Sequence, residues 1–372
     1  MHLLVAVTPH GYGHAAQVAP VIEALARRLP RTAVTLLTSV PHWFLRQRIH
    51  IDFELVERAP DFGLIMRSAL EIDIEASARA YADLHASWER RVSEEARRLE
   101  VLAPDLVLAD APYLTLAAAQ RAEIPAVGLC SLNWADIYRH YFGHRIEARS
   151  VLAQMEAAYH SAHRFLCPEP SMPMPRLANA MPIGAIAARG VGCRETLNRV
   201  FGIGPETTMV LVAPGGVETR FAVERWPARN DVHWLVSESW GVRHPDVSAF
   251  ERARMSFTDL VASCDAVLGK CGYGTVTECV ANATPLLYVP RPDWPEEATL
   301  LSWLRQHEAA VPVPPARLED GQFDDILAAA RTLQVRPCKA GGARQAAEVL
   351  YRYHGDCGPA IARPWGSNAA IR

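Results

Sequence analysis

The amino-acid sequence predicts an α/β protein built from two Rossmann-like domains with parallel sheets. Short apolar runs alternate with longer helical patterns along most of the 372 residues, and the same rhythm starts again in the second half. Strands that alternate with helices form βαβ units, whose strands pair in parallel. Half of the residues are hydrophobic, so the chain is long enough to bury two cores of ordinary size.

The first domain is expected to span residues 1–182 and to open with a strand. Apolar runs indicate strands at 2–7, 33–39, 105–110, 126–130 and 164–167. Helical periodicity lies between them, at 15–29, 74–102 and 114–122.

A proline-rich stretch separates the two predicted domains. Residues 167–182 contain five prolines, a density that favours extended chain and is typical of a linker. The second domain is expected at 183–340, and its strands are predicted at 209–213, 232–236, 266–268, 286–289 and 309–313. Residues 341–354 indicate a closing helix, and 355–372 a loosely ordered tail.

Composition and charge exclude several classes of protein. The net charge is −3, with acidic and basic residues mixed along the chain, so no nucleic-acid partner is expected. No apolar run approaches the roughly 18 residues of a membrane span, and residues 1–7 lack the basic start of a signal peptide, so we expect a cytoplasmic protein. The eight cysteines show no C-x-x-C spacing and the histidines no H-E-x-x-H pattern, so free thiols, no metal and no cofactor are expected. The oligomeric state stays open.

Two glycine-rich stretches follow predicted strands. They are "TPHGYGHAAQ" at 8–17 and "GKCGYGTVTE" at 269–278, and a Gly215-Gly216 pair follows a third strand. In parallel α/β sheets, ligands bind beyond the carboxyl ends of the strands, where helix N-termini expose N–H groups. Residues 272–275 therefore favour a diphosphate-binding loop, although an ordinary tight turn fits the same pattern. Neither stretch is a P-loop, because Lys270 precedes the glycines. Gly11-Tyr-Gly-His does not complete a G-x-G-x-x-G fingerprint, so nicotinamide and flavin binding are disfavoured.

Glu278 follows Thr275 by three residues. Its carboxylate is suited to accept hydrogen bonds from a ribose diol. A capping box, with Thr275 as the N-cap and Glu278 reaching back, explains the same spacing.

The second glycine stretch is part of a longer resemblance. "GKCGYGTVTECVANATPLLYVPRPDWPEEATLLSWL" resembles the donor-binding segment of GT-B glycosyltransferases, and more closely the glycosyltransferase-like N-terminal region of plant L-arabinokinases. That region shares the Gly-Lys-x-Gly-Tyr-Gly-Thr-Val-x-Glu core and the Glu-Glu pair. "HGYGHA" near the start, "PDFG" at 60–63, "NWADIY" at 133–138 and "RPC" at 336–338 extend the similarity from about residue 2 to about residue 354. The sugar-kinase domain of those plant proteins has no counterpart here, so sugar-1-kinase activity is not expected.

The resemblance implies a GT-B fold, with two Rossmann-like domains facing across a cleft. It also implies metal-independent, inverting transfer of a sugar from a nucleoside diphosphate sugar to an acceptor that the sequence does not identify. It places the leaving diphosphate at Gly215, Gly216, Gly272, Tyr273, Gly274 and Thr275, the donor ribose at Glu278, and the donor sugar at Glu296 and Glu297. The Asp-Gln pair common in the last region is absent, so the identity of the sugar is open. A solvated first helical turn is the alternative explanation for the two glutamates.

His14, at the end of the first glycine stretch, is the candidate base for the acceptor hydroxyl. It matches the N-terminal histidine of many family members, and an imidazole with a pKa of about 6.5 suits proton abstraction at neutral pH. Asp110, at the end of the strand 105–110, could orient and charge-stabilise this ring. His10 is a rival four residues away. The alternatives are that His14 packs in the turn or only binds substrate, and that Asp110 caps its own helix.

The acceptor side is expected in loops that follow the carboxyl ends of strands in the first domain. Gly11 and Gly13 of the first glycine stretch are expected there together with His10. Asn133 and Trp134 follow the strand 126–130, and the Trp134 ring could stack on a sugar or acceptor, although core packing explains it almost as well.

Two other functions fit the same architecture. One is a nucleotide-sugar epimerase of the 2-epimerase type, which a cluster of carboxylates around the anomeric carbon would favour over a single His–Asp pair. The other is a non-catalytic nucleotide-sugar-binding protein, because the related plant segment accompanies a kinase.

Overall fold

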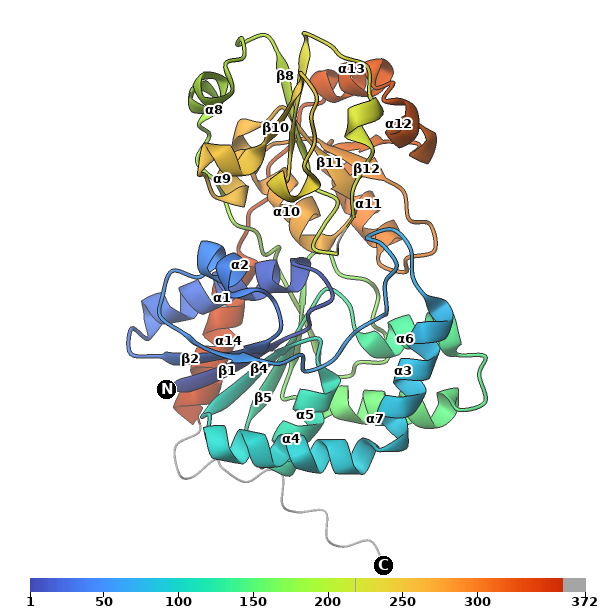
Figure 1. Ribbon diagram of the computed structural model, residues 1–372. Coiled ribbons are helices and arrows are strands. Elements are labelled where there is room, and N and C mark those ends of the chain that lie inside the picture. Colours follow the sequence, from blue (N-terminus) through green and yellow to red (C-terminus); the bar gives the residue numbers. More distant parts are fainter. Residues whose placement is uncertain (218, 357–372) are drawn as a thin grey trace, which may run out of the picture. The chain divides into compact units, whose positions relative to one another are not determined.

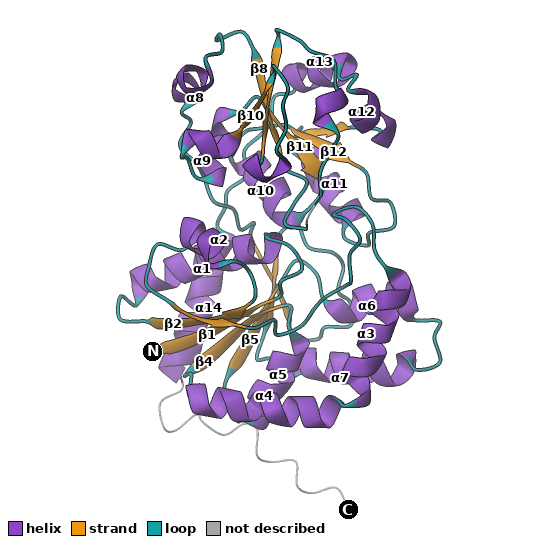
Figure 2. Cartoon of the chain, viewed as in Figure 1, coloured by secondary structure: helices purple, strands orange, loops and turns teal. Residues whose placement is uncertain are grey.

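The computed structural model describes residues 1–217 and 219–356 and divides them into two compact units (Figures 1 and 2). Unit 1 contains Met1–Ile65, Ile72–Ile186 and the chain from Gly341 on, and unit 2 contains Met66–Glu71 and Ala187–Ala340. Residues 357–372 of the predicted tail lie outside the described residues.

Unit 1 is built on a seven-stranded parallel sheet. The strand order is β3-β2-β1-β4-β5-β6-β7. The strands are β1 (His2–Val7), β2 (Ala33–Thr38), β3 (Glu54–Glu57), β4 (Leu106–Asp110), β5 (Ala126–Leu129), β6 (Phe165–Pro168) and β7 (Ala180–Ile183). The five predicted strands of this half are confirmed as β1, β2, β4, β5 and β6. The two that the sequence did not indicate, β3 and β7, are short, partly exposed strands at the sheet edges, so they carry no continuous apolar run.

Strand β7 lies in the proline-rich stretch that the sequence analysis interpreted as a linker. Pro182 of β7 pairs with Cys167 of β6. Proline lacks the N–H that a central strand must donate, so an edge strand is where a sheet tolerates it. The stretch is extended, as predicted, but its last residues belong to the sheet, and the chain enters unit 2 after Ile186.

Helices cover the sheet of unit 1. They are α1 (Gly13–Arg28), α2 (His42–Arg48), α3 (Ile74–Ala86), α4 (Trp88–Leu102), α5 (Tyr113–Arg121), α6 (Trp134–Phe142), α7 (Ala148–His160) and α14 (Gly342–Asp356). The single helix predicted at 74–102 is wrong: Ser87, with φ −120° and ψ 28°, ends α3 and begins α4. The predicted closing helix is α14, which packs beside α1 (Figure 1). Arg28 of α1 forms an ion pair of 3.0 Å with Glu348 and stacks over Tyr351, 4.1 Å from its ring centre.

Unit 2 repeats the architecture with a six-stranded parallel sheet of order β10-β9-β8-β11-β12-β13. The strands are β8 (Thr208–Val212), β9 (Val232–Val236), β10 (Val247–Ala249), β11 (Ala266–Lys270), β12 (Leu286–Val289) and β13 (Ala310–Pro312). Its helices are α8 (Arg194–Phe201), α9 (Phe257–Ser263), α10 (Tyr273–Ala281), α11 (Glu297–Gln306), α12 (Pro315–Asp320) and α13 (Asp324–Thr332), with short 3₁₀ turns at Val223–Arg225, Glu238–Trp240 and Phe250–Ala253. Trp226 anchors one side of the core, with ring centres 4.6 Å from Trp234 and 4.8 Å from Phe323.

A short segment from the first half of the sequence belongs to unit 2. The Ala69 N–H of Met66–Glu71 donates to the Thr219 hydroxyl at 2.6 Å, and its carbonyl accepts from the Arg291 guanidinium at 3.0 Å. Sequence pattern does not reveal this exchange, because the segment is neither helix nor strand.

Two further features concern the cysteines and the helices. Seven cysteines are free in the described part of the chain, and the eighth, Cys357, lies outside it. Within residues 1–217 and 219–356, no helix combines the length and the apolar character needed to cross a bilayer.

Candidate functional site

The glycine turn of unit 2 connects a buried strand to a helix that starts without a side-chain cap. β11 ends at Lys270, and Gly272, the N-cap of α10, makes no side-chain cap hydrogen bond. These N–H groups carry the positive end of the helix dipole. Gly272 and Thr275 are partly exposed, whereas Tyr273 and Gly274 are buried. The turn therefore presents backbone donors to a ligand at its outer residues.

Lys270 occupies the space that the glycines leave. A Cβ atom on Gly272 would lie 3.0 Å from the Lys270 Nζ, and one on Gly215 would lie 2.9 Å from its Cε. Gly215 has φ +122°, a conformation that side chains rarely adopt. The two glycine loops therefore flank one ammonium group. In the sequence, the position of Lys270 excludes a P-loop but gives no sign of this placement between the two glycine loops.

The surroundings of Lys270 make its charge costly. Burial and, to a smaller extent, the charge of Arg291 lower its pKa to about 7, against the opposing effect of Glu296 and Glu297. No hydrogen bond or ion pair joins Lys270 to another described residue. A cation beside a helix N-terminus and a second cation is repelled by both. An anion placed among these three groups would relieve that repulsion.

The two glutamates near the start of α11 are buried and engaged inside unit 2. Glu297 accepts hydrogen bonds from the Arg291 backbone N–H at 2.7 and 2.9 Å, and burial raises its pKa. Glu296 accepts from the Trp294 indole N–H at 3.2 Å. Arg291 in turn stacks on Trp294, 4.5 Å from the ring centre. The alternative of a solvated helical turn is wrong, because both glutamates are only 4 % exposed.

Glu278 lies in the second turn of α10 and not at its start. The helix begins at Tyr273 with Gly272 as N-cap, so the capping box with Thr275 is wrong. Glu278 is 1 % exposed, and its carbonyl accepts from the Asn282 side chain at 2.8 Å. Its proposed contact with a ribose stays a prediction.

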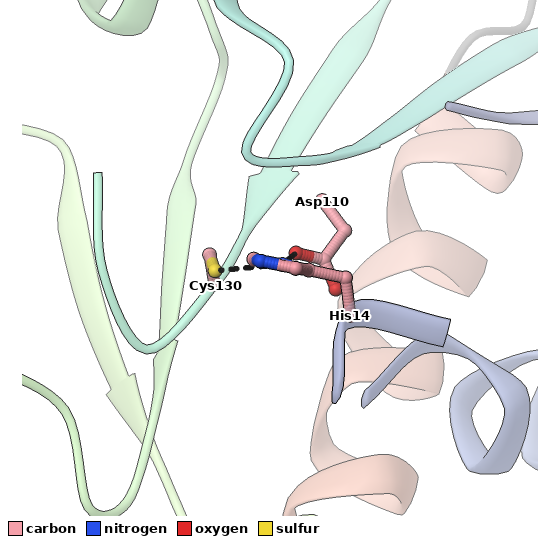
Figure 3. A group of neighbouring side chains, drawn as sticks. All are labelled: His14, Asp110 and Cys130. Atoms are coloured by element: carbon pink, nitrogen blue, oxygen red, sulfur yellow. Dashed lines mark hydrogen bonds and ion pairs between the residues drawn. The ribbon is translucent and has the colours of Figure 1, made fainter. Parts of the chain in front are cut away.

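In unit 1, the predicted His–Asp pair is formed. β1 and β4 are neighbours in the sheet, with Val7 opposite Asp110, so the loop after β1 and the end of β4 lie together. His14, the second residue of α1, places its Nδ1 2.9 Å from the Asp110 Oδ1 (Figure 3). Both residues are buried. The rival His10 is bound elsewhere: its Nδ1 accepts from the Leu64 N–H at 3.4 Å.

Cys130 completes a group of three possible metal ligands. Its Sγ lies 3.6 Å from the His14 Nδ1, and the ligand atoms of His14, Asp110 and Cys130 all lie within 4.8 Å of one another (Figure 3). Nitrogen and oxygen ligands on one tetrahedral zinc ion would be about 3.3 Å apart. The observed 2.9 Å between His14 and Asp110 is instead an ordinary hydrogen-bond length. The group is best described as a hydrogen-bonded pair with a thiol beside it.

Asp61 is a buried acid near this pair that the sequence analysis did not assign a role. It is 8 % exposed, and the Thr8 hydroxyl and the Trp134 indole N–H are donors placed close to its carboxylate. Burial raises the pKa of Asp61 to about 7, while Thr8, His14 and Trp134 lower it and Asp110 raises it. Its only trace in the sequence was the "PDFG" similarity.

Asn133, Trp134 and Gly11, which are expected on the acceptor side, have structural positions within unit 1. Asn133 is the N-cap of α6 and accepts from the Asp136 N–H at 2.8 Å. Trp134 is completely buried, with its ring centre 5.1 Å from that of His10, so it offers no stacking surface in this structure. Gly11 has φ +85° and turns the chain before α1, whose first residue is Gly13.

Two curated proteins are similar in sequence, whereas no family model matches. L-arabinokinase of Arabidopsis thaliana is 26% identical over 348 residues, which are 92% of this chain and 33% of that protein. The chain thus spans about a third of that relative's length. An uncharacterized glycosyltransferase of Methanopyrus kandleri is 23% identical over 321 residues, or 78% of this chain and 89% of the relative.

Solved structures of glycosyltransferases share the fold over nearly the whole chain. The calicheamicin glycosyltransferase CalG4 superimposes with a TM-score of 0.58 at 19% identity, covering 96% of this chain and 99% of its own. Arabidopsis thaliana UGT89C1, complexed with UDP, gives a TM-score of 0.53 at 16% identity, covering 95% of this chain and 90% of its own. The chain has the GT-B fold, and the resemblance seen in its sequence is confirmed.

Proposed function

We propose that the chain is a glycosyltransferase whose donor is a nucleoside diphosphate sugar, and that unit 2 binds the donor diphosphate at the N-terminus of α10. The observation that supports this proposal is the gathering of three positive groups at one place. They are the uncapped first turn of α10, the Lys270 ammonium and the Arg291 guanidinium. The GT-B fold and the two sequence relatives agree with it.

The shape of this place fits two linked phosphates. The Gly215 loop and the Gly272 turn both approach the end of the Lys270 side chain. The backbone can therefore come close to an anion at two points, with a compact charge between them. The helix dipole alone would contribute about 0.3–2 kcal/mol to anion binding.

In the proposed reaction, negative charge develops on the leaving diphosphate and a proton moves from the acceptor to His14. Sugar transfer breaks the bond between the anomeric carbon and the β-phosphate oxygen, and the positive groups stabilise the negative charge that develops on the diphosphate. The acceptor oxygen attacks the anomeric carbon from the opposite face, which inverts it, and gives its proton to His14. With its Nδ1 proton donated to Asp110, His14 keeps Nε2 as the accepting atom. No step needs a metal ion.

The glutamates take supporting roles in this proposal. Glu278 is the candidate for the donor ribose, and Glu296 for hydroxyl groups of the donor sugar. Glu297 holds the backbone of Arg291, so we assign it to the framework of the site.

A binding experiment tests the proposal through Lys270. We expect UDP, dTDP or one of a panel of their sugar conjugates to bind the protein in calorimetry. Lys270→Met should weaken that binding about 10- to 150-fold, the loss expected for a hydrogen bond to a charged group. Lys339→Met is the matched control, because Lys339 is the other lysine of the sequence and is exposed. If no nucleotide binds at millimolar concentration, or if Lys270→Met binds as the wild type does, the proposal is wrong.

Product analysis separates the transferase from a second candidate. Asp61 places a second carboxyl group near His14, and more than one carboxylate is the feature that favours a nucleotide-sugar epimerase. Incubation with the donor that binds, followed by NMR of the sugar, distinguishes the two. Released or transferred sugar supports the transferase, an epimerised nucleotide sugar supports the epimerase, and an unchanged donor indicates a binding protein.

A further inference from the structure

We infer that Tyr159 is a positioning residue of the His14 site. Its hydroxyl fixes the backbone of Ala111, and thereby the carboxyl group of the adjoining Asp110, which holds the His14 ring. The hydrogen bonds that carry this inference lie within unit 1. Its consequence for sugar transfer rests on the proposed function.

Ala111 has an unusual backbone conformation for its place in the chain. Its φ is +68°, a value that residues with a side chain rarely adopt. Pro112 adds to the strain, because a residue before proline is pushed toward extended backbone of negative φ. In the described part of the chain, the other non-glycine residues with positive φ all stand within two residues of the end of a helix or 3₁₀ turn, where that conformation is common. They are Ala103, Glu123, Arg254, Ala283 and Glu308.

Ala111 instead follows the strand β4 and precedes the helix α5. Backbone strain of this kind persists only where the surrounding structure holds it, and it is concentrated at functional sites. Ala111 comes directly after Asp110, so the contacts that hold it also bear on the His–Asp pair.

Tyr159 of α7 supplies the hydrogen bond that holds Ala111. Its hydroxyl donates to the Ala111 carbonyl at 2.8 Å and accepts from the Trp134 backbone N–H at 3.0 Å. Ala111 follows β4, and Trp134 begins α6 after β5, the neighbouring strand of the sheet. One hydroxyl therefore joins the backbones that follow two adjacent strands. Burial raises the pKa of Tyr159 well above its usual value, so the hydroxyl keeps the proton that it donates.

The Tyr159 ring is a rigid support for this hydroxyl. It is completely buried and packs against Tyr113 and Phe165, with ring centres 5.9 and 5.4 Å away. The Asn179 side chain donates to the Tyr159 carbonyl at 3.0 Å. Phenylalanine would fill the same space, so what the hydroxyl adds is its two bonds to backbone groups.

Asp110 connects Ala111 with His14. It is the last residue of β4, and its Oδ1 lies 2.9 Å from the His14 Nδ1 (Figure 3). Its own carbonyl accepts from the Thr8 N–H at 3.3 Å. The backbone around Asp110 is thus held by Thr8 and, through Ala111, by Tyr159. Loss of the Tyr159 hydroxyl should let Ala111 relax toward negative φ and carry the Asp110 carboxyl away from its partner.

NMR of the full chain tests the inference without any substrate. The ring ¹⁵N signals of His14 are assigned by their loss in His14→Gln and recorded at alkaline pH, where the imidazole is neutral. In the wild type, the bond to Asp110 should fix the ring proton on Nδ1. In Tyr159→Phe, we expect the signals to shift toward those of a ring that exchanges freely between its two tautomers. Adding Ala111→Gly to Tyr159→Phe should restore them, because glycine adopts positive φ without strain.

Tyr113→Phe is the matched control. It removes another buried tyrosine hydroxyl of unit 1, one that pairs with the His85 Nε2 at 2.9 Å, and should leave the His14 signals unchanged. The inference is overturned if the proton is not fixed on Nδ1 in the wild type, or if Tyr159→Phe gives the wild-type signals. It is also overturned if Ala111→Gly does not restore them, or if Tyr113→Phe shifts them as much.

The double variant also decides the case in which Tyr159→Phe does not fold. Recovery of the fold and of the His14 signals on adding Ala111→Gly would support the inference. A double variant that also fails to fold would show that the hydroxyl serves the fold alone, and would overturn it.

The catalytic consequence has a separate readout. If the protein transfers sugar, Tyr159→Phe should lower kcat about 10- to 100-fold, because a displacement of about 1 Å in a catalytic group can cost that much. Ala111→Gly should restore most of the loss. Calorimetric donor affinity should not change, because the donor is proposed to bind unit 2. A failure of the proposed function would appear as absent nucleotide binding, and the NMR result would still decide the role of Tyr159.

Discussion

At the scale of single residues, the Lys270 side chain explains why positions 215 and 272 are glycines, since it lies against both of them. The pattern around Gly272 predicts that something approaches the backbone closely. The structure shows that one such group is the Lys270 side chain, which lies against Gly215 and Gly272. The sequence could not predict this, because the course of a long side chain is decided by packing between two loops that are distant in sequence. The same holds for the burial of Asp61, because its loop is placed by tertiary contacts of the nearby Gly63 with Trp134 and Tyr81.

Lys270 makes donor affinity depend on pH in a predictable direction. Burial lowers its pKa to about 7 in the free protein, and a bound diphosphate favours the charged form. Binding above neutral pH must therefore take up a proton. We expect the affinity for UDP-glucose, or whichever sugar nucleotide binds best, to fall up to about tenfold per pH unit above pH 7 and to level off below it.

Calorimetry in buffers of different ionisation heat measures this proton uptake directly. Lys270→Arg serves as the control, because a guanidinium stays charged throughout the range and should remove the pH dependence. A flat affinity between about pH 6 and about pH 9 would contradict the assignment.

At the scale of secondary-structure elements, the sequence is most informative where apolar runs are long. The buried strands β1, β4 and β11 were predicted nearly residue by residue, and with them the loops that follow. Because parallel strands end at the same edge, the proximity of His14 and Asp110 could also be predicted. The break at Ser87 could not, because the helical pattern continues across it and only the backbone turns.

The start of α14 is an element boundary that depends on one glycine. A Cβ on Gly342 would lie 1.8 Å from the Gly184 carbonyl oxygen, and the Gly342 N–H donates to the Ala185 carbonyl at 3.0 Å. Gly342→Ala must push α14 away from this turn. We expect it to lower the free energy of unfolding by about 1–3 kcal/mol, as overpacking commonly does.

Chemical denaturation of Gly342→Ala and Gly204→Ala makes the comparison. A Cβ on Gly204 approaches nothing closer than 3.9 Å, so that variant should be nearly as stable as the wild type. Equal stability of the two variants would show that α14 adjusts without cost.

At the scale of the whole molecule, the two candidate sites lie in different units and should fail separately. His14 and Asp110 belong to unit 1, and Lys270 and the turn before α10 belong to unit 2. The alternation of strands and helices predicted two such units and their fold. It could not predict that α14 belongs to unit 1, although it follows unit 2 in the sequence, or that Met66–Glu71 belongs to unit 2, although unit 1 surrounds it in the sequence. Neither segment has a sequence pattern that identifies the unit in which it packs.

Two substitutions test this separation once a donor and a turnover assay are known. His14→Ala should reduce turnover about 10²–10⁴-fold while calorimetric donor binding survives, because it removes only the base. Lys270→Met should weaken calorimetric donor binding, because it removes a charge from the diphosphate site of unit 2. Loss of donor binding in His14→Ala would contradict the independence of the two sites.

The exchange of segments also governs how this gene can be divided. Arg291 and Thr219 hold their backbone partner in Met66–Glu71, and Arg28 holds its partner in α14. Cutting the coding sequence once near residue 186 would therefore deprive each product of a piece that the other one carries. A chimera of two such proteins should fold only when Met66–Glu71 comes from the same protein as the rest of unit 2, and α14 from the same protein as the rest of unit 1.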